Sequence, residues 1–97
     1  MIRSFGDDLT RDLYHGVVTN RTRRIDAGLA RGVLRKLDMI EAALVLDDLR
    51  SPPGNRLEAL SGDLAGWFSI RVNDQWRIIF RWVDNGAEDV TLVDYHR

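Results

Sequence analysis

The sequence predicts an α+β fold in which N-terminal helices pack on one side of a mostly antiparallel sheet. Apolar residues recur at helical spacing in the first half, and the second half alternates apolar and polar residues as strands do. Pro52-Pro53 marks the change between them. Helices and strands that are segregated along a chain are typical of α+β folds. Because 97 residues can bury one modest core, we expect a single domain over residues 1–97.

Helical signals dominate the first half. Residues 1–5 alternate apolar and polar side chains and are expected to form a short strand. A brief helix is expected between the acidic Asp7-Asp8 and Gly16, and a polar connection over residues 19–22 then leads into the main helix. We expect the main helix to run from Arg23 to about Leu46. Its inward apolar positions step by three or four residues: Ile25, Leu29, Val33, Leu37, Ile40 and Leu44.

Strand signals follow the two prolines. A short strand or extended arm is expected over residues 55–60, and a tight turn at Asn73-Asp74 separates the first two strands of a meander. Asp84-Asn85-Gly86 is a strong hairpin signal before the last strand. The three strands of this meander are expected at residues 67–72, 75–83 and 89–95.

Arginine occupies polar positions of the two central strands. Alternation puts Arg71, Arg77 and Arg81 on the face opposite Phe68 and Ile78. A planar guanidinium can hold anionic oxygens with two parallel hydrogen bonds, so this face is a candidate anion site. The alternative is that Arg71 and Arg81 are ordinary solvent-facing residues of a sheet. Arg77 is the stronger functional candidate because large apolar side chains flank it.

Composition restricts the classes of function. The sequence has no cysteine and only two, widely separated histidines, which argues against disulfides and a structural metal site. No apolar run approaches the roughly 20 residues of a membrane span, so a cytoplasmic location is expected. The net charge of −1 gives no overall support for nucleic-acid binding. Basic residues do gather over residues 21–36, although a solvated helix face is the alternative reading.

Several motifs together resemble one known family. The segment Asn73–Phe80 (NDQWRIIF), with Val93–His96 (VDYH) after it, resembles the HigB toxins of the RelE/ParE superfamily. The segments Ser51–Leu57 and Trp67–Val72 also resemble that family. The similarity extends over essentially the whole sequence and is least specific in the helical region.

The resemblance implies a toxin of a bacterial type II toxin–antitoxin system with a RelE/ParE-like fold. Members of the family are endoribonucleases that cut mRNA, typically in the A site of the 70S ribosome. They are neutralised by a HigA antitoxin with a helix-turn-helix domain, and the complex represses its own operon by binding operator DNA through the antitoxin. No metal or organic cofactor is expected.

Metal-free cleavage of RNA proceeds by attack of the ribose 2′-OH on phosphorus, which requires a base, an acid and cations. The resemblance implies that Arg77 holds the scissile phosphate, that Arg71 acts near the leaving group, and that Asp94, Tyr95 and His96 form a catalytic cluster. His96 titrates near neutral pH, and Asp94 would share its face on a continuing strand and orient it, with Tyr95 pointing the other way. The alternative for His96, next to the last residue of the sequence, is a disordered tail.

Two positions depart from the family pattern. Glu58 stands where some HigB toxins have histidine and remains a candidate general base, although an ordinary exposed strand residue is the alternative. Ser61 stands where some have lysine and supplies no charge, so a milder toxin is expected. Contacts to RNA or the ribosome are expected from the remaining basic residues: Arg23, Arg24, Arg31, Arg35, Lys36, Arg56 and Arg81.

Two rival functions stay open. ParE-like members of the same fold inhibit DNA gyrase and need no nuclease residues, although the terminal Asp94-Tyr95-His96 argues against that function. Alternatively, the chain is a weakly toxic partner of its antitoxin in operon repression.

Overall fold

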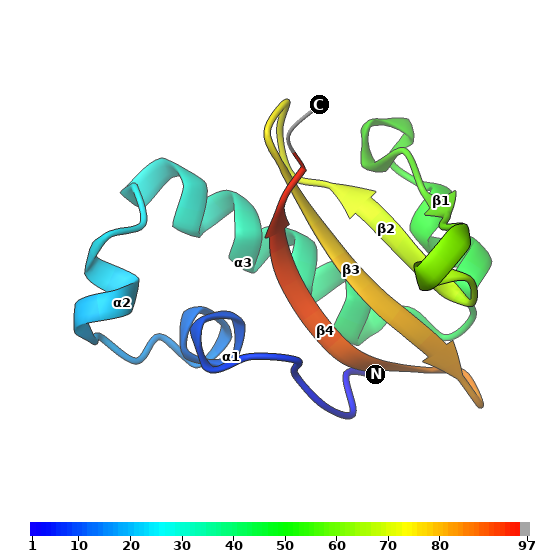
Figure 1. The fold of residues 1–97 in the computed structure, drawn as a ribbon, viewed down its shortest axis with the longest axis horizontal. Helices are drawn as coiled ribbons and strands as arrows, with labels where there is room; N and C mark the ends of the chain where they lie inside the picture. Colours follow the sequence, from blue (N-terminus) through cyan, green and yellow to red (C-terminus); the bar gives the residue numbers. More distant parts are fainter. Residues whose placement is uncertain (96–97) are drawn as a thin grey trace.

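The computed structural model describes residues 1–95, and it confirms helices followed by an antiparallel sheet. In this part of the chain, no helix is long and apolar enough to cross a membrane. Short 3₁₀ helices join the helical and strand regions (Figure 1). The elements in chain order are α1 (Asp8–His15), α2 (Asn20–Arg23), α3 (Ala27–Ala42), η1 (Leu46–Arg50), η2 (Pro53–Asn55), β1 (Glu58–Ala59), η3 (Gly62–Leu64), β2 (Trp67–Arg71), β3 (Trp76–Val83) and β4 (Gly86–Asp94).

The four strands pair antiparallel in the order β1-β2-β3-β4. Ile70 pairs with Ile78, and Arg71 pairs with Arg77 one residue further along. Because successive side chains of a strand point to opposite faces, this register gives the sheet one apolar face and one face that carries the arginines. The predicted facial pattern of the two central strands is confirmed.

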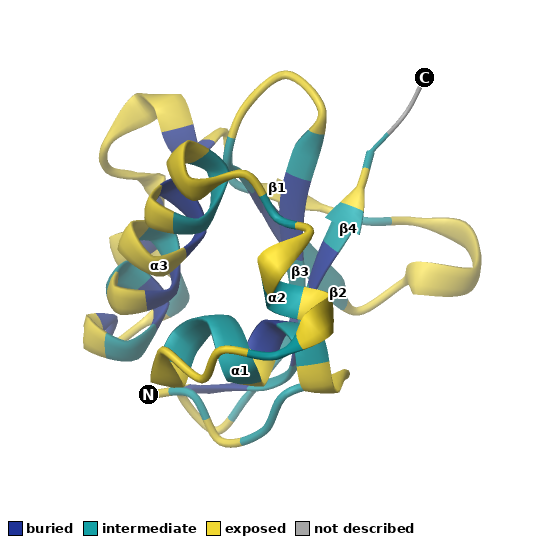
Figure 2. Cartoon of the chain, turned by 90° about the vertical axis from the view of Figure 1, so that its left-hand side faces the viewer, coloured by how far each residue is buried: buried dark blue, intermediate teal, exposed yellow. Residues whose placement is uncertain are grey.

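The core lies between α3 and the apolar face of the sheet. Val33, Leu37 and Ile40 on α3 are fully buried, as are Ile78 and Phe80 on β3. Figure 2 shows the buried residues of α3 along the side that faces the strands. Figure 1 shows α3 crossing behind the sheet, and no α-helix of residues 1–95 crosses in front of β3. The arginine-bearing face is therefore open to a ligand.

The predicted N-terminal strand forms only in part. Ile2 and Phe5 make isolated parallel bridges to Ala87 and Val90 of β4, without a continuous ladder. Between these bridges the N–H of Asp89 donates to the side-chain Oγ of Ser4 instead of to a backbone carbonyl (2.9 Å). Asp89 has a φ of 55° and lies at a register shift between β3 and β4, so β4 is too irregular here for a regular partner strand.

The main helix is shorter at its start than predicted. Thr19 caps the separate helix α2 inside the expected polar connection, and its Oγ1 accepts from the N–H of Thr22 (3.1 Å). Asp26 then caps α3 by accepting from the N–H of Leu29 (3.1 Å). Ile25, predicted on the helix face, therefore lies before α3. The capping hydrogen bonds of Thr19 and Asp26 therefore set where the helices begin, although the apolar pattern continues through this segment.

The main helix also ends earlier than predicted. The Asp48 carboxylate accepts from the N–H groups of Leu44 (2.9 Å) and Val45 (3.2 Å), and Ala43 is extended. Leu44 was predicted to face inward, but it lies beyond α3 and is 78% exposed. Residues 47–50, predicted as a possible last turn, belong to the separate 3₁₀ helix η1.

Candidate active site

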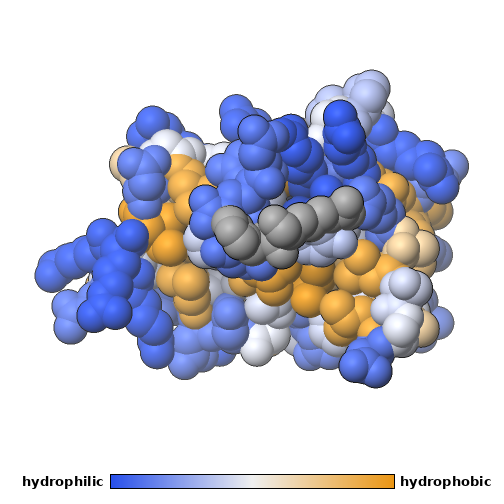
Figure 3. Space-filling view, turned by 45° about the horizontal axis from the view of Figure 1, so that its top comes forward, coloured by the Kyte–Doolittle hydropathy of each residue, from blue (hydrophilic) through white to orange (hydrophobic). Residues whose placement is uncertain are grey.

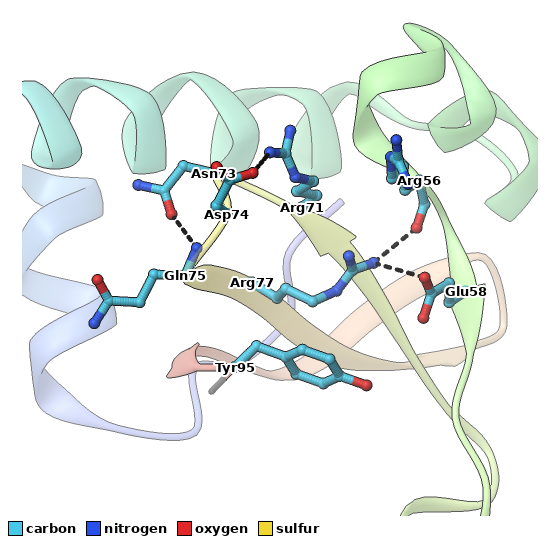
Figure 4. Close-up of a pocket in the computed structure, with 8 residues that line it drawn as sticks. All are labelled: Arg56, Glu58, Arg71, Asn73, Asp74, Gln75, Arg77 and Tyr95. Carbon is cyan, nitrogen blue, oxygen red and sulfur yellow. Dashed lines mark hydrogen bonds and ion pairs between the residues drawn. The ribbon is translucent and has the colours of Figure 1, made fainter. Parts of the chain in front are cut away.

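Arg77 is the central residue of the open face. It lies in the middle of the sheet on β3 and is only 6% exposed. Its Nε donates to the Oγ of Ser69 (2.8 Å), and its Nη2 donates to the backbone carbonyl of Arg56 (2.7 Å). Arg56 has a φ of 45°, and its carbonyl points at the guanidinium (Figure 4). These bonds fix the orientation of a buried cation.

One side of this guanidinium remains available. Within residues 1–95, no hydrogen bond engages its Nη1. The Glu58 carboxylate, on β1, lies 3.9 Å from Nη2, which is an ion pair without a close hydrogen bond. Arg77 can therefore offer a donor to an anion without breaking the bonds that orient it.

Arg77 opens into a pocket of about 510 Å³ at the β2–β3 turn. Figure 4 shows Arg71 and Arg56 above the Arg77 guanidinium and the Tyr95 ring below it. Among the described residues that line the pocket, three arginines face two carboxylates, so their formal charge is one positive unit. The pocket is lined by Arg56, Glu58, Arg71, Asn73, Asp74, Gln75, Arg77 and Tyr95.

The electrostatics of Arg77 favour an added anion. Burial is the main cause of a lowered pKa of its guanidinium; Glu58 and Tyr95 oppose this effect, and the nearby cations Arg71 and Arg56 add smaller lowering effects. An arginine keeps its charge at neutral pH despite such a shift. A lowered pKa means that the cation is incompletely stabilised by its surroundings, and a bound phosphate would supply the missing negative charge.

Arg71 lies across the pocket from Arg77. It forms an ion pair with Asp74, which lies in the β2–β3 turn. The side chain of Asp74 is 99% exposed. Asn73 stabilises the same turn, because its Oδ1 accepts from the N–H groups of Gln75 (2.9 Å) and Trp76 (2.8 Å). The turn thus holds the Asp74 carboxylate against the Arg71 guanidinium, which could otherwise bind a ligand.

The residues at the end of β4 lie on two faces. Asp94 pairs with Trp76, so it lies on the opposite face from Arg77, and its Oδ2 accepts from Gln75 Nε2 (3.0 Å). Tyr95 lies on the face of Arg77, with the guanidinium carbon 5.5 Å from its ring centroid. Of the predicted terminal cluster, Tyr95 therefore lines the pocket and Asp94 does not. His96 lies outside the described residues.

Arg81 is on the same face of β3 as Arg77 but does not line this pocket. Its Nη2 donates to Asp89 Oδ2 (2.8 Å) and Glu88 Oε1 (3.1 Å). The hydrogen bond to Asp89 is the main cause of a raised pKa of the Arg81 guanidinium. Arg81 is therefore already neutralised by carboxylates at the far end of the sheet.

The basic helical residues occupy separate places. Lys36 donates to the Oδ1 of the fully buried Asn55 (2.6 Å), and burial is the main cause of its lowered pKa. Arg31 and Arg35 flank a shallow apolar groove on α3. Arg23, with Arg24 as the next residue, lies at the end of α2, on the left of Figure 1. The structure does not gather these cations into one patch with Arg77.

Sequence reasoning missed three parts of the site. Ser69 and the carbonyl of Arg56 orient Arg77, and Asp74 pairs with Arg71. The alternation of β2 and β3 already puts Ser69 on the face of Arg77, so its role could have been inferred. The carbonyl direction depends on the left-handed conformation of Arg56, which no side-chain pattern encodes. Within residues 1–95, no group of three or more acidic or histidine side chains is placed to hold a metal ion.

The antiparallel sheet with helices on one side is a fold that this chain shares with solved toxin structures. The structure is similar to a chain of the YoeB–YefM toxin–antitoxin complex from Staphylococcus aureus, with a TM-score of 0.63, 16% identity and coverage of 100% of this chain and 99% of that one. It is also similar to a YafQ mutant from E. coli, with a TM-score of 0.64, 12% identity and coverage of 98% and 94%.

The chain belongs to the HigB-like toxins, the RelE-like toxins of type II toxin–antitoxin systems, because the model of that family matches residues 3–96. It is 49% identical to Toxin HigB-1 of Vibrio cholerae over 77 residues, which are 79% of this chain and 80% of that protein. It is 29% identical to Endoribonuclease HigB of Proteus vulgaris over 96 residues, covering 99% and 100%. The family resemblance of the sequence is confirmed, and membership implies an antitoxin partner.

Proposed function

We propose that this toxin is a ribosome-dependent endoribonuclease that cuts mRNA without a metal ion and is neutralised by a HigA-type antitoxin. It acts in the cytoplasm on mRNA in the 70S ribosome, and it reaches operator DNA only through the antitoxin. The observation that carries the proposal is the buried guanidinium of Arg77, oriented by Ser69 and Arg56 toward an open, positively charged pocket. Similarity to Endoribonuclease HigB of Proteus vulgaris supports the same activity.

In the proposed reaction, the scissile phosphate binds between Arg77 and Arg71. The ribose 2′-OH gives its proton to a base as its oxygen bonds to phosphorus, and the bond from phosphorus to the 5′-oxygen breaks. The departing oxygen takes a proton from an acid, so the products are a 2′,3′-cyclic phosphate and a 5′-hydroxyl. Guanidinium groups stabilise the charge that develops on the phosphorane-like transition state.

The proton-transfer roles follow from position and chemistry. Glu58 lines the pocket beside Arg77 and is proposed as the base. His96 is proposed as the acid because an imidazolium loses its proton near neutral pH. Tyr95, next to the guanidinium, is proposed to contact the substrate. Asp94 is the last residue of β4 and lies on the face opposite Arg77, so no contact with the substrate is proposed for it; its proposed role is to orient His96.

The remaining basic residues are proposed to contact RNA or the ribosome, and their contributions to binding are expected to differ. Arg56 lines the pocket itself, and Arg35 and Lys36 would add positive charge near Arg71, since Arg35 and Arg71 contribute, after burial, to the lowered pKa of Lys36. Arg23, Arg24 and Arg31 would meet more distant ribosomal phosphates. The contribution of Arg81 would be small, because Asp89 and Glu88 already occupy its guanidinium.

The proposal is tested by separating RNA cleavage from gyrase inhibition. Wild-type toxin is expected to cut mRNA on programmed 70S ribosomes and to leave DNA supercoiling by gyrase unchanged. His96→Ala should abolish cleavage and growth arrest while antitoxin binding stays intact. Full growth arrest by His96→Ala, together with loss of supercoiling, would show a gyrase inhibitor instead. Absence of both toxicity and cleavage in the wild type would indicate a partner in repression.

A second prediction concerns Asp74, which competes with the substrate for Arg71. Asp74→Asn is expected to raise kcat/KM for cleavage on ribosomes about two- to fivefold, because exposed ion pairs contribute up to about 1 kcal/mol. The matched control is Asp47→Asn, since Asp47 pairs with Arg50 at the same sequence spacing (2.6 Å), outside the pocket. An unchanged or lower kcat/KM for Asp74→Asn would contradict the competition.

A further inference from the structure

A second pocket adjoins the arginine pocket on the same open face. It encloses about 400 Å³ and shares Glu58 and Tyr95 with the first pocket. Its floor is formed by Ile79 and Val93, which lie on the arginine-bearing face because Ile79 pairs with Ser69, and Val93 pairs with Arg77. The loop from β1 to η3 supplies the other wall. A ligand that extends out of the first pocket past Tyr95 would enter the second.

The chemistry of the second pocket differs from that of the first. Among residues 1–95, no arginine or lysine lines it, and Leu60, Leu64, Ile79 and Val93 give it largely apolar walls. Leu64 is 39% exposed although it is a large hydrophobic residue. Figure 3 shows hydrophilic and hydrophobic surface side by side where the top of Figure 1 comes forward. An apolar recess beside a charged pocket suits a ligand with one anionic and one flat, weakly polar part.

We propose that the second pocket binds one nucleobase of the RNA, next to the phosphate held by Arg77. The inference rests on the proposed endoribonuclease function. A nucleotide has the required two parts, a phosphate and a base whose faces pack on apolar and aromatic side chains. The shared wall of Tyr95 places the two parts side by side. In the described part of the chain, Ser61 and Glu58 are the polar side chains at this pocket besides Tyr95, so base binding depends mainly on stacking and fit.

The apolar lining of the second pocket limits how well it can distinguish one base from another. A site that recognises base edges needs several fixed donors and acceptors, as discrimination by hydrogen bonds requires. The second pocket instead offers apolar walls, which favour any base and discriminate weakly among the four. It therefore contributes affinity and position for the nucleotide, while strong sequence preference would have to come from another part of the complex.

The test uses 70S ribosomes programmed with a short synthetic mRNA that carries an abasic residue on one side of the cleaved bond or on the other. For wild-type toxin, removal of the base on one side is expected to slow cleavage about tenfold, since stacking of one base contributes on this scale. Removal on the other side should matter less. Equal, normal rates on both abasic mRNAs would overturn the proposal. Failure to cut the unmodified mRNA would instead overturn the proposed function.

The variant Leu64→Ala connects this effect to the pocket. It should slow cleavage of the unmodified mRNA several-fold and make the enzyme less sensitive to the abasic residue. The matched control is Leu34→Ala on α3, because Leu34 is equally exposed (38%) and lies outside the pocket. Unchanged cleavage by Leu64→Ala, with weaker antitoxin binding, would assign the pocket to the antitoxin and overturn the proposal.

Discussion

Arg77→Ala is expected to reduce cleavage of mRNA on programmed ribosomes by about 10²- to 10³-fold, the scale found when one donor that stabilises an oxyanion is removed. The physical reason is that Arg77 is the buried, oriented cation of the pocket, and its bonds to Ser69 and Arg56 hold it in place. Water that fills the space cannot replace a fixed positive charge. Single-turnover cleavage kinetics measure the loss, and growth arrest on expression should disappear.

Two further variants keep this prediction independent of folding. Arg77→Lys retains the charge without the planar pair of donors, and we expect an intermediate loss of about tenfold. Arg81→Ala removes a guanidinium from the same strand and face, but one already paired with Asp89 and Glu88, so a change below about threefold is expected. Equal losses in Arg77→Ala and Arg81→Ala would show that overall charge, not the pocket, determines activity. Binding to the antitoxin checks that each variant folds.

Asn55→Ala is expected to lower the free energy of unfolding by about 2–3 kcal/mol, because buried polar groups that lose their partners each cost about 1–3 kcal/mol. Asn55 is fully buried and joins three segments. It accepts from Lys36 Nζ (2.6 Å) and donates to the carbonyls of Leu49 (3.2 Å) and Ser51 (3.4 Å). For a domain of this size, the melting temperature should fall by about 10–20 °C.

The control for this variant is Asn20→Ala, since Asn20 is exposed at the start of α2. Its melting temperature should change by less than about 4 °C, as for surface substitutions generally. Lys36→Met should also destabilise the fold, which would distinguish the structural role of Lys36 from a contact with the ribosome. A melting temperature of Asn55→Ala within 2 °C of the wild type would show that the buried amide is dispensable.

The alternation of the central strands made much of the site predictable. Arg71 and Arg77 were expected on one face, and the register places them opposite each other beside one pocket. Tyr95 was expected to point away from Asp94, and it does; this direction brings it to Arg77. Period-two alternation is a local property of the backbone, so residue order alone contains it.

Other features depend on contacts between distant segments. No pattern near Arg81 reveals that Asp89 and Glu88 pair with it, because the partners come from another strand at an irregular register. Lys36 belongs to a basic run in the sequence, yet in the structure it donates to the buried Asn55 of η2, which lies in a different element. A charged side chain receives its partner from the tertiary structure, so its availability to a ligand is not visible in a single segment.

The sequence by itself determined the family, the order of helices and strands, and the face on which the central arginines lie. Sequence motifs and the helical and strand periodicities are properties of residues that are close together in the chain. Only the tertiary structure decided which cation is available to an anion. Within residues 1–95, Arg77 is buried and oriented and its Nη1 makes no hydrogen bond, whereas Arg81 is held by two carboxylates. The reason is physical: burial and pairing depend on groups that the chain brings together only by folding.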